Sequence, residues 1–339
     1  MALPALASGE AGIAHLRPLP WLRNPHVQTI LAAKMSLARE PVSSTWLVPL
    51  PDGDTIALEM STPPGWQDTQ QTVLLLHGLC GCHRSPYMQR LARKLLQCGI
   101  RAIRMNLRGC GSGKGLARYP YHSGRSADVL AVLEALQRVT PGALTTLVGF
   151  SLGGNIVLKL AGELADSAAR YLRQVIAICP PVDLHACARL LAQPVNRIYN
   201  HYFTRLLCAD VAYRQERFPD LTPVRLPSRL TLYEFDECYT APQCGFRDAL
   251  DYYQQCSAAP LVARITVPCA VLFASDDPMI AADALDAYTL PANVRLTRTR
   301  YGGHLGFLGL PGSATGYRAL DTQILAWITG QAAPPPLLW

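Results

Sequence analysis

The segment Gly149-Phe150-Ser151-Leu152-Gly153 places a serine between two glycines at the spacing G-x-S-x-G. The apolar residues 144–148 ahead of it predict a strand, and residues 153–164 predict a helix. A sharp strand-to-helix turn presents the serine hydroxyl at the carboxyl edge of a parallel sheet, and glycine lets the two elements approach closely. The pattern is typical of a nucleophile elbow, and it predicts that Ser151 attacks a carbonyl carbon.

A serine hydroxyl is a poor nucleophile at neutral pH, so it needs a base and a group that orients that base. After such an elbow the acid and then the histidine follow in chain order. Asp276-Asp277-Pro278 comes directly after a predicted strand at residues 269–274, and His304 lies in a glycine-flanked loop after the last predicted strand, residues 294–299. This order predicts His304 as the general base.

Two adjacent carboxylates compete for the position of the acid. Neighbouring residues that leave a strand point in different directions, so we expect only one of them to reach His304. Pro278 fixes the backbone directly after Asp277, which favours Asp277 as the acid. Asp276 is expected to accept a hydrogen bond from the following loop, as aspartate often does in turns.

The negative oxygen that forms during attack on a carbonyl needs two backbone donors. The amide of Leu152, directly after the nucleophile, is the first candidate. The second is expected in the loop after the predicted strand 73–76, where His77-Gly78-Leu79-Cys80-Gly81 stands, and we assign it to the amide of Leu79. His77 is expected to brace this loop rather than to act in the chemistry.

Two other motifs are weaker candidates for a metal or a nucleotide. Cys80-Gly81-Cys82-His83 lacks a second ligand pair at zinc-site spacing. The glycine-rich residues 108–115 do not match G-x-x-x-x-G-K-[ST], because Gly115 follows Lys114, and they do not match G-x-G-x-x-G. We therefore expect no metal and no cofactor.

The elements that must position these residues alternate between strands and helices. Strands are expected at residues 45–50, 55–60, 73–76, 101–107, 144–150, 175–179, 269–274 and 294–299, and helices at 87–98, 127–139, 153–164, 281–288 and 317–328. Such alternation predicts an α/β protein with a mostly parallel, doubly wound sheet. The expected organisation is an irregular N-terminal arm (1–44), a core (45–182 and 261–330), a helical lid insertion (183–260) and a tail (331–339).

The lid insertion is rich in aromatic residues, and long insertions are usually functional. Its position after the sixth core strand places it over Ser151. Apolar side chains there would contact the acyl part of a substrate. We expect this role for Tyr199, Tyr202 and Phe203.

Composition narrows the class of protein. The chain has 339 residues, of which 50% are hydrophobic and 16% charged, so it can bury a large core. Its net charge of +7 is spread without a basic block, which argues against nucleic-acid binding. No apolar run reaches the ~18 residues of a membrane span, and we expect no secretory signal at the start of the chain. The odd number of 11 cysteines has no disulfide spacing, which favours the cytoplasm.

Further motifs make the pattern more specific, and together the motifs run from about residue 20 to residue 330. They are Trp21-Leu22-Arg23-Asn24-Pro25-His26-Val27-Gln28-Thr29, His77-Gly78-Leu79, Ser85-Pro86-Tyr87, Asn106-Leu107-Arg108-Gly109-Cys110, Tyr121-His122-Ser123-Gly124, Gly149-Phe150-Ser151-Leu152-Gly153-Gly154-Asn155, Phe235-Asp236, Asp251-Tyr252-Tyr253, Cys256-Ser257-Ala258, Asp276-Asp277-Pro278 and Gly302-Gly303-His304-Leu305-Gly306-Phe307. With them the chain resembles the YheT-like branch of the α/β-hydrolases, which is related to eukaryotic abhydrolase-domain phospholipases and yeast ethyl-ester synthases. The resemblance implies an α/β-hydrolase fold and a carboxylic-ester hydrolase with the triad Ser151, Asp277 and His304. We expect the chain to lack the N-terminal membrane anchor of the eukaryotic relatives, so their phospholipid substrates are not transferred to it.

The expected activity is hydrolysis of short- to medium-chain carboxylic esters by a serine hydrolase that forms an acyl-enzyme. The expected partner is a small-molecule ester, without nucleic acid and without an integral membrane span. Two alternatives stay open: acyl transfer to an alcohol, and a non-catalytic ligand-binding protein on a hydrolase fold. A nucleotide-dependent enzyme is disfavoured because the phosphate motifs fail.

Overall fold

The computed structural model describes residue 13 and residues 16–35, 39–310 and 316–330, and a mixed sheet forms its centre. The strand order is β1-β2-β4-β3-β5-β6-β7-β8. The pairs β1–β2 and β2–β4 are antiparallel, and every pair from β4 to β8 is parallel. The predicted doubly wound α/β fold is therefore confirmed. The strands are β1 (Ser44–Pro49), β2 (Thr55–Ser61), β3 (Thr72–Leu76), β4 (Arg101–Met105), β5 (Thr145–Phe150), β6 (Leu172–Ile178), β7 (Cys269–Ala274) and β8 (Val294–Thr299).

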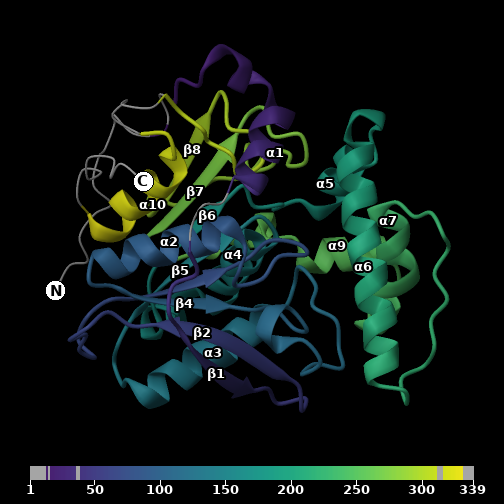
Figure 1. Ribbon diagram of the computed structural model, residues 1–339, viewed down its shortest axis with the longest axis horizontal. Coiled ribbons are helices and arrows are strands. Elements are labelled where there is room, and N and C mark those ends of the chain that lie inside the picture. The colour runs from purple at the N-terminus through teal and green to yellow at the C-terminus, as the bar shows by residue number, and fades with distance from the viewer. Residues whose placement is uncertain (1–12, 14–15, 36–38, 311–315, 331–339) are drawn as a thin grey trace.

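Helices cover both faces of this sheet (Figure 1). Helix α2 packs against β4 and α10, while α4 packs against β5, β6 and α3. This double cover explains why the central strands are continuous apolar runs, since every residue of β3, β5 and β7 is buried. The helices are α1 (Pro25–Lys34), α2 (Pro86–Gln97), α3 (Ser126–Val139), α4 (Leu152–Leu164), α5 (Leu184–Leu191), α6 (Arg197–Arg217), α7 (Leu232–Phe235), α8 (Ala241–Gln243), α9 (Ala249–Cys256) and α10 (Ala319–Thr329).

The segment expected to form a lid, residues 183–260, holds the helices α5 to α9. Figure 1 shows α5, α6, α7 and α9 gathered on one side of the molecule, away from α2 and α10. Part of this segment has a small apolar core of its own, built from Leu184, Ala188, Ala241, Ala249, Tyr252, Tyr253 and Cys256. Across the described ranges, no helix combines the length and apolar character that crossing a lipid bilayer requires.

The N-terminal arm, residues 1–44, was expected to be irregular, but part of it is helical. Residues 25–34 form helix α1, whose N-terminus is capped by Asn24: its side chain accepts hydrogen bonds from the amides of His26 (2.9 Å) and Val27 (3.1 Å). Pro25 at the first helical position supports the same start. The helix lacks an apolar stripe because its buried residues are Gln28, Thr29 and Ala32, so periodicity could not reveal it. The predicted tail, residues 331–339, lies outside the described residues.

The prediction of a helix at residues 281–288 is also wrong. This segment forms successive turns, in which backbone amides donate hydrogen bonds to carbonyls three residues earlier. A helix would use the carbonyl of Ala282 to bind the amide of Asp286. In the structure the Arg298 side chain donates to that carbonyl over 2.9 Å. Tertiary contact with β8 therefore replaces the local helical bond.

Candidate active site

Ser151 sits on a sharp turn between β5 and α4. Its backbone has φ 51° and ψ −121°, which is strained for a residue with a side chain. A Cβ on Gly149 would overlap the carbonyl of Gly153, and a Cβ on Gly153 would lie 2.6 Å from the carbonyl oxygen of His77. The two glycines of the motif are thus required by contact between strand, helix and the neighbouring loop.

His304 lies between Ser151 and Asp277 and contacts both. Its Nε2 is 2.9 Å from the Ser151 Oγ, and its Nδ1 is 2.8 Å from the Asp277 Oδ2. An ionised carboxylate only accepts hydrogen bonds, so the proton of a neutral imidazole belongs on Nδ1. This leaves the Nε2 lone pair free to accept the serine proton. The structure therefore brings the three predicted residues together in the predicted order.

The two adjacent aspartates have different partners. The Oδ1 of Asp277 accepts from the amides of Met279 (2.9 Å) and Ile280 (3.2 Å), which aims Oδ2 at His304. The Oδ1 of Asp276 instead accepts from the amide of Gly303, 2.9 Å away in the loop that carries His304. Burial raises the pKa of Asp276. Asp276 thus holds the loop, and Asp277 holds the ring.

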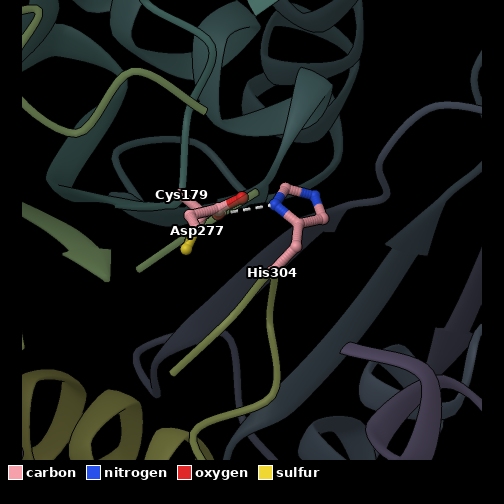
Figure 2. A group of neighbouring side chains, drawn as sticks. All are labelled: Cys179, Asp277 and His304. Carbon is pink, nitrogen blue, oxygen red and sulfur yellow. Dashed lines mark hydrogen bonds and ion pairs between the residues drawn. The ribbon is translucent and has the colours of Figure 1, made fainter. Parts of the chain in front are cut away.

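Cys179, the residue after β6, lies beside this pair. Figure 2 shows its side chain next to Asp277, whose carboxylate faces the His304 ring. Candidate ligand atoms of Cys179, Asp277 and His304 lie within 4.8 Å of one another. Burial raises the pKa of the Cys179 thiol well above its usual value, and the Asp277 charge adds to this. Burial thereby favours the neutral thiol over the thiolate, which is the form that binds metals.

The alternative cysteine–histidine motif does not form a ligand cluster among the described residues. His83 has its Nδ1 2.9 Å from Asn106 Oδ1 and its Nε2 3.3 Å from Glu40. The Cys80 thiol lies 3.9 Å from the Tyr121 hydroxyl. These groups serve the packing of the loop.

The backbone amides of Leu79 and Leu152 differ from those around them in their hydrogen bonding. The amide of Gly78 donates to the Tyr87 hydroxyl and that of Cys80 to the Tyr121 hydroxyl, each over 3.0 Å. Within the described part of the chain, the amide of Leu79 between them donates to no protein acceptor, and neither does that of Leu152. Both residues border the cavity that holds Ser151 and His304.

That cavity extends from Ser151 to the helices of residues 183–260. Its walls are largely apolar, and Phe203 is among them. It also contains buried polar groups: Arg214 pairs with Asp210 (2.7 Å), and Asp236 accepts from the Tyr253 hydroxyl (2.7 Å). Burial raises the pKa of Asp236 to about 6. The main apolar lining residues are Leu79, Leu152, Leu184, Ala188, Leu191, Phe203, Leu207, Val211, Leu232, Phe235, Met279 and Ile280.

The three residues expected to bind substrate do not all face the cavity. Phe203 lines the cavity, whereas the described lining includes neither Tyr199 nor Tyr202. Tyr202 is 50% exposed. Tyr199 stacks on His26 of α1, and its hydroxyl lies 3.0 Å from the His26 Nδ1. Successive residues of a helix face different directions, so an aromatic cluster in the sequence could not assign one face to the cavity.

The glycine-rich loop at residues 108–115 has a structural role. The buried guanidinium of Arg108 forms ion pairs with Asp52, Asp54 and Asp128 at 2.6–2.7 Å. These carboxylates raise the pKa of Arg108. The loop is thereby tied to the β1–β2 turn and to α3.

His77 braces the loop of Leu79, as expected. Its Nδ1 donates to the Gly78 carbonyl (2.8 Å), and its Nε2 accepts from the amide of Leu107 (3.1 Å). Protonation would place a second donor against the Leu107 amide. Burial lowers the pKa of His77 to about 4.

This buried histidine should make the fold sensitive to acid. The ring is neutral in the folded chain, while the unfolded chain binds a proton near pH 6.5, so stability is present above pH 6.5 and is lost as the pH falls toward 4. Urea denaturation should show His77 lowering the free energy of unfolding by roughly 2 kcal/mol between about pH 7 and pH 5. Ring NMR signals of His77 that titrate near neutral pH in the folded protein would contradict this assignment.

The mostly parallel sheet, the elbow at Ser151 and the histidine and acid at later strand ends define a class, the α/β-hydrolases. The chain belongs to the α/β-hydrolase fold family, whose model matches residues 71–309. It is 33% identical over 303 residues to YheT of Escherichia coli (strain K12), covering 87% of this chain and 88% of that protein. The resemblance to the YheT-like branch is thereby confirmed.

Other relatives are named as enzymes of ester chemistry. Mouse phospholipase ABHD3 is 27% identical over 307 residues, covering 86% of this chain and 72% of that protein. The medium-chain fatty acid ethyl ester synthase/esterase 2 of Saccharomyces cerevisiae is 28% identical, covering 70% of this chain and 58% of that protein. Est1E of Butyrivibrio proteoclasticus, solved with ferulic acid, has the same fold at a TM-score of 0.55 and 15% identity, covering 85% of this chain and 100% of that one.

Proposed function

We propose that the chain is a carboxylesterase-type serine hydrolase with Ser151, His304 and Asp277 as its triad. The observation that carries this proposal is the hydrogen-bonded chain from the Ser151 hydroxyl through His304 to Asp277. His304 Nε2 takes the serine proton while Ser151 attacks the ester carbonyl. Asp277 keeps the proton of the neutral ring on Nδ1 and stabilises the imidazolium that forms.

The tetrahedral intermediate places a negative charge on the former carbonyl oxygen. The amides of Leu79 and Leu152 donate to this oxygen, a role supported by the lack of another acceptor among the described residues. His304 then protonates the leaving alcohol, which separates and leaves the acyl group on Ser151. In the second half, His304 activates water, which releases the acid and restores the serine.

The largely apolar cavity supports an ester with a short- to medium-chain acyl group. Relatives named as a phospholipase, a monoacylglycerol lipase and a medium-chain ethyl ester synthase/esterase agree with acyl esters as the substrate class. All 11 cysteines are free thiols, which supports a reducing compartment such as the cytoplasm. A panel of p-nitrophenyl esters of graded acyl length tests the proposal, because no length should be cleaved if the site is only a binding pocket.

Replacing Phe203 should change the preferred acyl length. Alanine removes a ring from the cavity wall, so longer chains should gain relative to short ones, by about tenfold in the ratio of kcat/KM values. Tyr202→Ala serves as the matched control, since Tyr202 is the neighbouring aromatic residue and lies outside the lining. Identical acyl profiles for the wild type and both variants would remove Phe203 from the substrate site.

Acyl transfer to an alcohol is a second candidate. An apolar site disfavours water as the acceptor, and one relative is named as both synthase and esterase. Product analysis in the presence of ethanol distinguishes the two reactions. A ratio of ethyl ester to free acid that exceeds the molar ratio of ethanol to water supports transfer. Free acid as the sole product supports hydrolysis.

A further inference from the structure

Helix α1 lies against the loop that carries His304 (Figure 1). The Thr29 Oγ1 accepts a hydrogen bond of 2.9 Å from the backbone amide of His304 and donates one of 2.7 Å to the Pro25 carbonyl. Thr29 is only 8% exposed. This bond acts on the backbone of the very residue whose ring bridges Ser151 and Asp277.

A second residue of α1 holds the end of the same loop. The fully buried Gln28 accepts from the amide of Leu308 through Oε1 (2.8 Å) and donates to the Leu308 carbonyl through Nε2 (3.4 Å). The loop and helix also touch through backbone. A Cβ on Gly303 would overlap the Pro25 carbonyl, and one on Gly306 would lie 2.9 Å from the Gln28 carbonyl oxygen.

The loop itself needs external support. Gly303, Leu305 and Phe307 all have positive φ (52°, 61° and 42°), a conformation that residues with side chains rarely adopt. Such a backbone persists only when its surroundings determine it. Asp276 supplies one anchor at the Gly303 amide, and α1 supplies the other at His304 and Leu308.

We propose that α1 is a brace for the general base and that Thr29 is a positioning residue, which sets the His304 ring through its backbone amide. This inference rests on the triad proposed above. Without the Thr29 hydroxyl the amide of His304 loses its acceptor, and the loop can shift relative to Ser151. A misplacement of about 1 Å can cost on the order of 100-fold in rate, because proton transfer requires close alignment.

The test compares Thr29→Val, which keeps the shape of the side chain but lacks the hydroxyl, with Thr29→Ser, which keeps it. Thr29→Val should lower kcat by about 10- to 100-fold with KM nearly unchanged, whereas Thr29→Ser should restore most of kcat. Thr322→Val is the matched control, since the Thr322 hydroxyl also bonds a carbonyl one helical turn earlier, on α10. Melting temperatures and the rate of labelling by a fluorophosphonate probe are recorded for each variant.

The outcomes separate this inference from the triad. Wild-type kcat in Thr29→Val, or an equal loss in Thr29→Ser, overturns the positioning role while an inactive Ser151→Ala leaves the triad intact. A loss that appears in KM rather than in kcat also overturns it. An active Ser151→Ala protein overturns the proposed function itself. Slow labelling of Thr29→Val with rescue by Thr29→Ser supports the brace.

Discussion

Replacing Ser151 with alanine should lower kcat for ester hydrolysis by roughly 10⁶ and leave the fold intact. The change removes one oxygen, which in the structure contacts the His304 Nε2. Alanine tolerates the positive φ of this position no worse than serine does, so the elbow should still form. Initial rates on the ester panel and the melting temperature measure the two effects separately.

A matched serine shows whether the loss is specific. Ser167→Ala removes an exposed hydroxyl that bonds the Leu164 carbonyl, so it should keep wild-type activity and labelling. A fluorophosphonate probe should label the wild type and Ser167→Ala but not Ser151→Ala. Retention of more than about a tenth of the activity by Ser151→Ala would remove Ser151 from the mechanism.

The elbow and the later strand ends could be predicted because their signals are local. An apolar run, a glycine-flanked serine and a following helical pattern occupy about 20 consecutive residues, and each fixes its own geometry. Parallel strands then place their carboxyl ends at one edge, which brings residues 151, 277 and 304 near one another. The hydrogen bonds that a serine hydroxyl, an imidazole and a carboxylate can form then predict how these three residues pair. This prediction does not depend on the structure of residues 183–260.

Contacts between distant segments carry no such local signal. Asn155 on α4 donates to the Ser123 and Cys256 carbonyls (3.0 and 2.8 Å) and accepts from the amide of Ala258 (2.9 Å). Three of the family motifs, those with Ser123, Asn155 and Cys256, therefore meet at the Asn155 side chain. This side chain joins helix α4 to the end of the segment 183–260. Helix α1 is similar, since its two buried polar residues, Gln28 and Thr29, bond to a loop about 275 residues later. The family motifs include these residues, but their hydrogen-bond partners become evident only in the folded structure.

Replacing Asp277 with asparagine should lower kcat on the order of 10⁴-fold. The Oδ1 can still accept from the amides of Met279 and Ile280, so the side chain should keep its place. Its other atom then becomes an amide nitrogen, which donates and cannot accept from His304 Nδ1. The ring is pushed to the tautomer with the proton on Nε2, where it can no longer take the serine proton.

Asp276→Asn is the matched control, because it changes the neighbouring carboxylate in the same way. The Asp276 Oδ1 accepts from Gly303, and an asparagine oxygen can do the same. Its Oδ2 is buried and bonds no partner in the described ranges, so an amide nitrogen there would lack an acceptor and cost about 1 kcal/mol of stability. Asp276→Asn should therefore lower the melting temperature with little effect on kcat. Asp277→Asn should instead lower kcat with little effect on the melting temperature. If Asp276→Asn abolishes turnover and Asp277→Asn does not, the two aspartates exchange roles, and the 2.8 Å contact between Asp277 and His304 is not the one that orients the base.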